Sequence, residues 1–245
     1  MTSLKKIITL HADERFEVEF NSGNLQAKTA VIFVHGFGVK RQSRGLFVDI
    51  ESICLDTMLS VRAEYSQVLD DRCIALPFQI QRQRLNKIIH YIQDHYNIDN
   101  CIFIGHSQGC ITIALELPHN ALTLLLAPPI LSPFEEFINT KGWKNPGSHL
   151  NIQGNSRLVR SDLIIEVPTH FWSEFKTIDA QSLYRDLAKH NDVRIVFAEN
   201  DQVLGNQQPI GHIPTYSIKE ANHDFSSTPR VKLLQLISKL ILDRA

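Results

Sequence analysis

The chain alternates between short apolar runs rich in β-branched residues and segments whose apolar residues recur every three or four positions. Residues 29–35 (T-A-V-I-F-V-H) are almost entirely apolar, which is typical of a strand buried on both faces of a parallel sheet. Similar runs predict the other strands, at residues 4–10, 16–20, 59–65, 100–104, 121–127, 193–198 and 213–218.

Helical spacing separates many of these strands. An amphipathic helix is predicted over residues 78–96 by the recurrence of Leu85, Ile88, Ile89, Ile92 and Tyr96. A second helix is expected at residues 111–117, and a closing helix begins near Thr228, a suitable N-cap, with Pro229 in its first turn. Strands that alternate with helices predict an α/β fold with a mostly parallel central sheet flanked by helices.

Residues 128–175 interrupt this alternation. They hold five of the ten prolines and both tryptophans, and their apolar residues follow no clear period. A connection of this length inside a compact domain is usually functional. We therefore expect one core made of residues 1–127 and 176–245, with residues 128–175 as an inserted cap. Trp143 and Trp172 are candidates for lining a substrate pocket there, although aromatic residues that pack the cap onto the core would give the same pattern.

Composition narrows the classes of partner. The formal net charge is -1, so no overall field favours nucleic acid or an anionic membrane. The N-terminal apolar run is too short for a signal peptide, and no stretch has the length of a membrane span. Four cysteines without a C-x-x-C pair suit a reducing compartment. We expect a cytoplasmic protein without stable membrane insertion.

A serine flanked by two glycines follows the predicted strand 100–104. The segment Gly105-His106-Ser107-Gln108-Gly109 then continues into the helix predicted at 111–117. A serine on such a sharp strand-to-helix turn has a strained backbone, and glycines two residues away on each side relieve the crowding. The hydroxyl is held at the N-terminus of a helix, whose dipole favours developing negative charge. Ser107 is therefore the candidate nucleophile.

A nucleophilic serine that attacks an acyl group needs donors for the oxyanion that forms. The backbone N–H of Gln108, directly after the nucleophile, is one candidate. The loop His35-Gly36-Phe37-Gly38 follows the buried strand 29–35, and its glycines allow the backbone to turn close to the reacting carbon. Phe37 is the second candidate donor.

The general base has to lie at the same sheet edge as Ser107, where the parallel strands end. His212 precedes the predicted strand 213–218 and belongs to the opposite edge, whereas His223 follows that strand. His106 lies inside the serine turn and is expected to orient it. His223 is therefore the candidate base.

The same argument selects the acid that orients the base. Asp192 precedes the strand 193–198 and lies at the wrong end, whereas Glu199 and Asp201 both follow it. Asp201 is deeper in the loop and is the preferred partner of His223, with Glu199 as the alternative. The resulting chain order is Ser107, Asp201, His223.

The chain resembles the α/β-hydrolase superfamily over almost its whole length. The resemblance rests on H-G-F-G, G-H-S-Q-G, N-D-Q-V and A-N-H-D-F. Within the superfamily, the chain is similar to small cap-bearing carboxylesterases such as feruloyl or cinnamoyl esterases, which often show G-H-S-Q-G-G. Here Cys110 replaces the last glycine. The resemblance implies a serine hydrolase that cleaves carboxylic esters through an acyl-enzyme, with no cofactor and no metal.

The triad leaves the scissile bond open. A thioesterase, an acyltransferase or a C–C hydrolase would use the same residues, and a non-catalytic ligand-binding protein could keep the fold. Lys40, Arg41 and Arg44 form a basic cluster after the oxyanion loop, which is either solvated or in contact with an acidic tail of a thioester substrate. A small-molecule ester or thioester is the expected partner, and the sequence does not determine the oligomeric state.

Overall fold

The computed structural model describes residues 2–11, 14–22, 27–54, 58–161 and 163–242. Its central sheet has the strand order β1-β2-β4-β3-β7-β8-β11-β12. In this order the bounds are Thr2–His11, Glu14–Ser22, Met58–Ala63, Thr29–Val34, Asn100–His106, Leu122–Leu126, Asp192–Ala198 and Thr215–Ile218. β2 is antiparallel to both its neighbours, and the other adjacent strands pair in parallel. The predicted mostly parallel sheet is confirmed.

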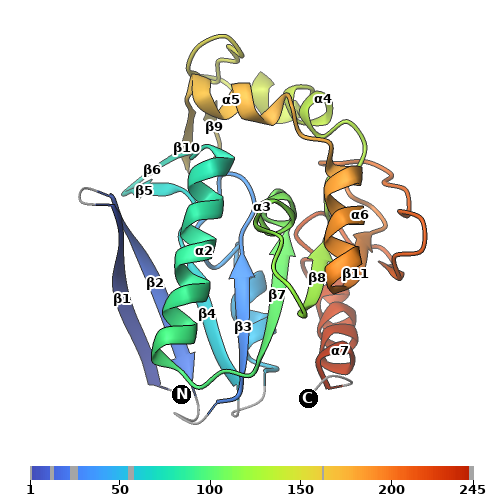
Figure 1. Cartoon of the computed structure of the whole chain (residues 1–245). Coiled ribbons are helices and arrows are strands. Elements are labelled where there is room, and N and C mark those ends of the chain that lie inside the picture. Colours follow the sequence, from blue (N-terminus) through green and yellow to red (C-terminus); the bar gives the residue numbers. More distant parts are fainter. Residues whose placement is uncertain (1, 12–13, 23–26, 55–57, 162, 243–245) are drawn as a thin grey trace.

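Helices cover both faces of the sheet (Figure 1). One apolar cluster packs α2 (Phe78–His95), α3 (Gly109–Glu116) and α6 (Ala180–His190) against the sheet. A second cluster packs α1 (Leu46–Glu51) and α7 (Thr228–Leu242) on the opposite face. Because side chains alternate along a strand, β3 contributes Ile32 to the first cluster and its neighbours Val31 and Phe33 to the second.

The segment 128–175, called the insertion below, lies over the carboxyl ends of the parallel strands (Figure 1). The rest of the chain is called the core. It contains α4 (Pro133–Ile138), a 3₁₀ helix η1 (Lys141–Lys144), β9 (Ser156–Val159), β10 (Ile164–Val167) and α5 (Thr169–Phe175). A hairpin of the core, β5 (Gln67–Leu69) and β6 (Arg72–Ile74), joins it in a second sheet with the order β5-β6-β10-β9. β10 pairs in parallel with β6, so backbone hydrogen bonds tie the insertion to the core.

The predicted elements agree with the structure where the apolar pattern is long. The helix expected at 78–96 is α2, and the strand expected at 213–218 begins only at Thr215, after Pro214. The sequence reasoning did not identify α6, although Ala180, Tyr184 and Leu187 lie one or two turns apart and are all buried.

Candidate active site

The backbone of Ser107 has the conformation that the glycine pattern predicts. Its φ is 54°, in the left-handed region, and its N–H donates to the carbonyl oxygen of Leu126 at 2.9 Å. A Cβ at position 109 would lie 2.0 Å from the carbonyl oxygen of Val34, and one at 105 would lie 3.0 Å from the Cα of Cys110. Gly105 and Gly109 are thus required for the close packing of α3 against β3 and β7.

Cys110 occupies the position at which the resembling esterases often have glycine. Its side chain is fully buried, and its Sγ lies 3.7 Å from the carbonyl oxygen of Leu126, the residue that also accepts from the Ser107 N–H. Burial raises the pKa of the Cys110 thiol well above its usual value. The thiol is therefore a protonated packing group behind the serine turn.

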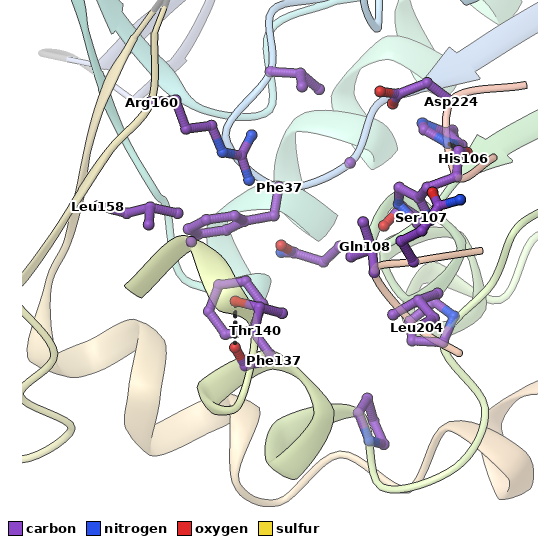
Figure 2. Close-up of a pocket in the computed structure, with 18 of the residues that line it drawn as sticks. Phe37, His106, Ser107, Gln108, Phe137, Thr140, Leu158, Arg160, Leu204 and Asp224 are labelled. Carbon is purple, nitrogen blue, oxygen red and sulfur yellow. Dashed lines mark hydrogen bonds between the residues drawn. The ribbon is translucent and has the colours of Figure 1, made fainter. Parts of the chain in front are cut away.

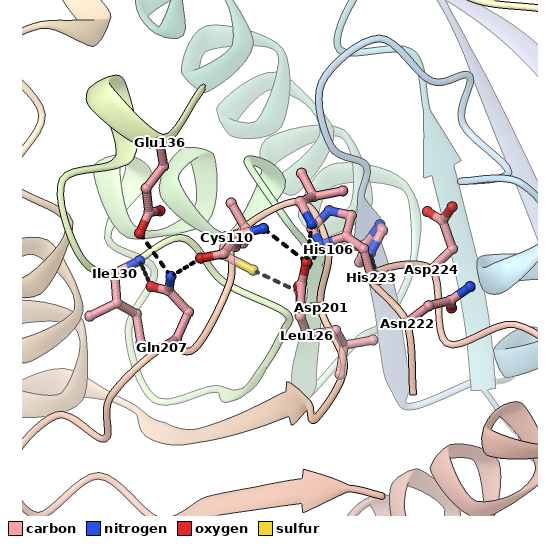
Figure 3. A network of polar contacts seen from close by, with 12 residues as sticks. His106, Cys110, Leu126, Ile130, Glu136, Asp201, Gln207, Asn222, His223 and Asp224 are labelled. Atoms are coloured by element: carbon pink, nitrogen blue, oxygen red, sulfur yellow. Dashed lines mark hydrogen bonds and ion pairs between the residues drawn. The ribbon is translucent and has the colours of Figure 1, made fainter. Parts of the chain in front are cut away.

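His223 and Asp201 come from the loops after β12 and β11 and meet at this edge of the sheet (Figure 3). The Nδ1 of His223 lies 2.7 Å from Oδ2 of Asp201. The other carboxylate oxygen, Oδ1, accepts the backbone N–H groups of Val203 and Leu204 at 2.8 and 2.9 Å. Because a carboxylate oxygen accepts in this hydrogen bond, Nδ1 of His223 carries a proton, and in the neutral tautomer the lone pair is on Nε2.

The competing residues are engaged elsewhere. The Oε2 of Glu199 accepts the backbone N–H of Glu220 at 2.8 Å, which ties the ends of β11 and β12 together. His212 is exposed and precedes β12, at the sheet edge opposite Ser107. The structure therefore brings Asp201, rather than Glu199, to His223.

Ser107 and His223 line the same cavity. Among the described residues, no hydrogen bond joins the Ser107 hydroxyl to His223. Such bonds are often long or poorly aligned before a substrate binds. The proton transfer of a serine triad would require this hydrogen bond to form when a substrate binds.

The loop after β3 lies directly against the nucleophile. A Cβ at Gly36 would be 3.0 Å from the Cβ of Ser107. Burial lowers the pKa of His35, so its ring is neutral. The Nε2 of His35 accepts the Tyr65 N–H at 2.9 Å, which leaves the ring proton on Nδ1, and Nδ1 donates to the Gly36 carbonyl at 2.8 Å.

The hydrogen bond between His35 and the Gly36 carbonyl determines the direction of the next amide, that of Phe37. In a trans peptide the N–H points opposite to the C=O, so the Phe37 N–H points away from His35. Within the part of the chain that the structure describes, neither this N–H nor that of Gln108 donates a hydrogen bond to the protein. Both residues line the cavity beside Ser107, as oxyanion donors would.

His106 connects three loops at this site. Its Nε2 lies 2.9 Å from the carbonyl oxygen of His223, and its Nδ1 lies 2.9 Å from Oγ of Ser43. Burial, followed by the charge of His223, lowers the pKa of His106 to about 4, so the ring is neutral at pH 7. Since a carbonyl only accepts, Nε2 carries the proton and the Ser43 hydroxyl donates to Nδ1. Ser43 has no motif around it, and the sequence reasoning missed it.

A cavity of about 360 Å³ opens in front of Ser107 (Figure 2). Its walls are mostly apolar and come from both the core and the insertion: Phe37, Pro129, Pro133, Phe137, Leu158 and Phe175. Phe37 and Phe137 meet edge to face with ring centroids 4.5 Å apart. Residues of both the core and the insertion thus line the site.

The two tryptophans lie behind this wall and do not line the cavity, contrary to the sequence-based expectation. Trp172 is fully buried, and its Nε1 donates to Oγ of Ser156. Trp143 donates from Nε1 to the carbonyl oxygen of Phe137 at 3.0 Å. Both rings pack against Phe137, with centroids 5.7 and 5.8 Å away. A pattern of apolar residues does not distinguish the exposed side of such a cluster from the buried side.

The basic cluster after the oxyanion loop divides between different partners. Lys40 donates to the carbonyl oxygen of Asp70 at 3.4 Å, and Arg44 forms an ion pair of 3.0 Å with Asp224. Of the three cations, Arg44 lines the cavity. Arg41 is largely buried and forms ion pairs with three carboxylates, those of Glu17, Glu19 and Glu64.

Neither a metal centre nor a membrane span emerges from the described residues. They contain no group of three or more His, Cys, Asp or Glu side chains placed to hold a metal ion. No helix within the same ranges has the length and apolar character needed to cross a membrane.

Comparisons with known proteins support the fold. No family model and no curated protein sequence matches the chain. Among solved structures, the chain is similar to Est1E from Butyrivibrio proteoclasticus with ferulic acid bound, at 14% identity and a TM-score of 0.73 over 98% of each chain. The esterase domain of a Rhodothermus marinus protein gives 13% identity and a TM-score of 0.71 over 98% of each chain. The siderophore hydrolase EstB from Aspergillus fumigatus gives 11% identity and a TM-score of 0.62, also over 98% of each chain. The strand order, the serine turn and these likenesses together show that the chain has the α/β-hydrolase fold.

Proposed function

We propose that this protein is a serine hydrolase that cleaves carboxylic esters of small molecules. The observation that carries the proposal is the 2.7 Å hydrogen bond between His223 and Asp201, beside a cavity that Ser107 also lines. A serine in a left-handed turn, an imidazole with its free Nε2 and a buried carboxylate are the parts of a nucleophilic triad.

In the first half-reaction, Nε2 of His223 takes the proton of the Ser107 hydroxyl while Oγ attacks the ester carbonyl carbon. The tetrahedral intermediate collapses, His223 gives its proton to the departing alcohol, and the acyl group stays on Ser107. In the second half-reaction, His223 takes a proton from water as the water oxygen attacks the acyl carbon. The second tetrahedral intermediate collapses, His223 gives the proton to Oγ of Ser107, and the acid is released. Asp201 keeps the imidazole in the correct tautomer and stabilises its charged form.

The Phe37 and Gln108 N–H groups are proposed to donate to the oxyanion. Two features support this assignment: neither amide has a hydrogen-bond partner within the described residues, and His35 holds the Gly36 carbonyl turned away. Removal of one such donor typically costs about a hundredfold to a thousandfold in kcat.

The acyl group is proposed to lie in the cavity in front of Ser107, against the wall that Phe37 and Phe137 form. Its mostly apolar wall supports an apolar or aryl acyl group, and one solved structure of the same fold holds ferulic acid. No cofactor is included in the proposal. The four cysteines are free thiols in the structure, which supports the cytoplasmic location proposed from the sequence.

The decisive experiment compares the wild-type protein with Ser107→Ala on 4-nitrophenyl esters of increasing chain length and on a methyl hydroxycinnamate. Loss of a triad nucleophile typically lowers kcat by about a millionfold. We expect Ser107→Ala to lose hydrolysis and labelling by a fluorophosphonate probe while its circular dichroism spectrum stays unchanged. Near-normal hydrolysis by the folded variant would contradict the proposal.

A matched series of oxygen and thio esters then determines the bond. Faster turnover of oxygen esters supports the carboxylesterase assignment. A thioester preference would assign the same triad to a thioesterase instead.

A further inference from the structure

Gln108 has a side chain that the triad does not use. The residue is only 7% exposed, and it lines the cavity in front of Ser107. Figure 2 shows its carboxamide extending away from Ser107 toward the side of the cavity that Phe37 and Phe137 line. No hydrogen bond of the described residues involves this carboxamide, which has two N–H donors and an acceptor oxygen.

The polar groups nearby are engaged with other partners. The Thr140 hydroxyl donates to the carbonyl oxygen of Phe137 at 3.0 Å, and Nη1 of Arg160 donates to the carbonyl oxygen of Gly38 at 3.2 Å. Figure 2 shows the rings of Phe37 and Phe137 on the side toward which the carboxamide extends. Gln108 is therefore a polar group that faces an apolar space.

An amide that is removed from water without a compensating hydrogen bond costs about 1–3 kcal/mol in proteins. A leucine or methionine would fill the same wall without that cost. An apolar acyl group that fills the cavity would displace water from the carboxamide and impose this cost. A polar atom of the substrate would replace the lost hydrogen bond, so the complex gains relative to one with an apolar substrate.

We propose that the Gln108 carboxamide is a specificity-determining group that hydrogen-bonds an oxo or hydroxyl substituent on the acyl chain of the substrate. The proposal rests on the proposed ester hydrolase function. It narrows the substrate class to esters whose acyl chain carries a hydrogen-bonding oxygen a few bonds from the scissile carbonyl.

The acyl side is favoured by the geometry of the site. The acyl group stays bonded to Ser107 through both half-reactions, whereas the alcohol has to leave and water has to enter. In Figure 2, Gln108 extends from Ser107 toward Phe37 and Phe137, on the side opposite Asp224, the neighbour of the proposed base His223. The enclosed side beneath the insertion thus fits the group that remains bound.

The test uses pairs of esters that differ in one group: 4-nitrophenyl pentanoate against 4-oxopentanoate, and hexanoate against 5-oxohexanoate. Each kcat/KM is divided by the rate of spontaneous hydrolysis of the same ester, which removes differences in intrinsic reactivity. We expect wild-type protein to favour at least one oxo ester over its apolar partner. Gln108→Met should lower this oxo-to-apolar ratio by about tenfold or more, since the oxo group then enters an apolar wall without a donor.

Gln202→Met is the matched control. Gln202 is a second glutamine at the same cavity, but it is exposed to solvent. Its replacement should leave the ratio within about twofold of the wild-type value. A ratio of rates cancels any general damage to the nucleophile or to the oxyanion donors.

The outcomes separate the two proposals. If wild-type protein hydrolyses the apolar esters, favours neither oxo ester, and keeps the same ratios in Gln108→Met, the role of Gln108 is wrong and the hydrolase function stands. If wild-type protein hydrolyses none of the four esters and resists the fluorophosphonate probe, the hydrolase function itself fails. Should Gln108→Met not fold, the wild-type ratios and Gln108→Asn, which withdraws the carboxamide by one methylene, provide the same test.

Discussion

Asp201 is distinguished from Glu199 by its hydrogen bonds, since both carboxylates follow β11. Asp201 contacts the ring of His223, whereas Glu199 contacts the backbone of Glu220. We predict that Asp201→Asn lowers kcat by about ten-thousandfold, the loss found where the imidazole takes the wrong tautomer in a triad. Glu199→Gln should change kcat by less than about tenfold. Steady-state kinetics on one 4-nitrophenyl ester measures both, and the reverse ranking would assign the acid to Glu199.

His106 makes stability depend on pH. Its pKa is lowered to about 4 in the folded protein, from 6.5 for an ordinary histidine, chiefly by burial. The unfolded chain therefore takes up the proton first as the pH falls. Stability from this group is fully present above pH 6.5 and is lost progressively down to about pH 4, by a total of about 3 kcal/mol.

Urea unfolding at pH 7.5 and pH 4.5 measures this loss. His106→Gln should reduce the difference between the two pH values, because the variant has no group there to protonate. His90→Gln, which replaces an exposed histidine on α2, should leave the difference unchanged. His35 is also buried with a lowered pKa, so some pH dependence remains in every variant. An unchanged difference in His106→Gln would contradict the assignment.

The candidate catalytic residues were accessible from the sequence because each one follows a recognisable strand. The position of a residue at a strand end fixes its sheet edge, and that was enough to separate His223 from His212. Ser43 had no such signal. Its contact depends on how loops far apart in the chain meet, because Ser43 reaches His106 across 63 residues of sequence.

At the scale of elements, one glutamine joins the start of the insertion to the loop that carries Asp201 (Figure 3). The Oε1 of Gln207 accepts the N–H groups of Ile130 and Leu131 at 2.8 and 3.1 Å. Its Nε2 donates to Glu136 and to the carbonyl oxygen of Leu204, at 2.9 and 2.6 Å. Leu204 also donates its N–H to Asp201, so the link is continuous from α4 to the candidate acid.

We predict that Gln207→Leu destabilises the protein by about 2–4 kcal/mol, because two backbone N–H groups lose their acceptor. Amide exchange at Ile130 and Leu131 should accelerate, and kcat should fall if the acid loop moves. Gln208→Leu, at the exposed neighbouring position, is the control and should leave all three unchanged. Equal stability of the two variants would show that the link is unimportant.

Short elements were the hardest to predict. β9 and β10 have four residues each, and β6 has three. Runs of this length show too few alternations to be separated from loops, and their stability comes from pairing with one another. The pairing of β10 with β6 joins segments about ninety residues apart, which no local pattern indicates. The long periodic helix α2 and the buried strand β3, in contrast, were predicted nearly to the residue.

At the scale of the whole molecule, the insertion and the rest of the chain contribute to one cluster of buried apolar residues. The cluster that contains α2 and α3 also includes Ile165 and Phe171 of the insertion. Phe171 stacks on Phe78 of α2, and Ile165 packs so closely that a Cβ at Gly38 would lie 2.3 Å from its Cδ1. A segment held by backbone pairing, by Gln207 and by this aromatic packing is expected to unfold together with the core rather than to open as a separate lid.

Trp143 and Trp172 are the two tryptophans of the chain, and both belong to the insertion, so tryptophan fluorescence reports on it. Far-UV circular dichroism reports mainly on the core, which holds the longest helices, α2 with 18 residues and α7 with 15. We predict that guanidinium unfolding gives the same midpoint by both methods. Ile165→Ala should lower both midpoints together, because such a truncation in a core typically lowers the free energy of unfolding by about 2–5 kcal/mol. A fluorescence transition that precedes the loss of circular dichroism would show instead that the insertion unfolds independently and could act as a lid.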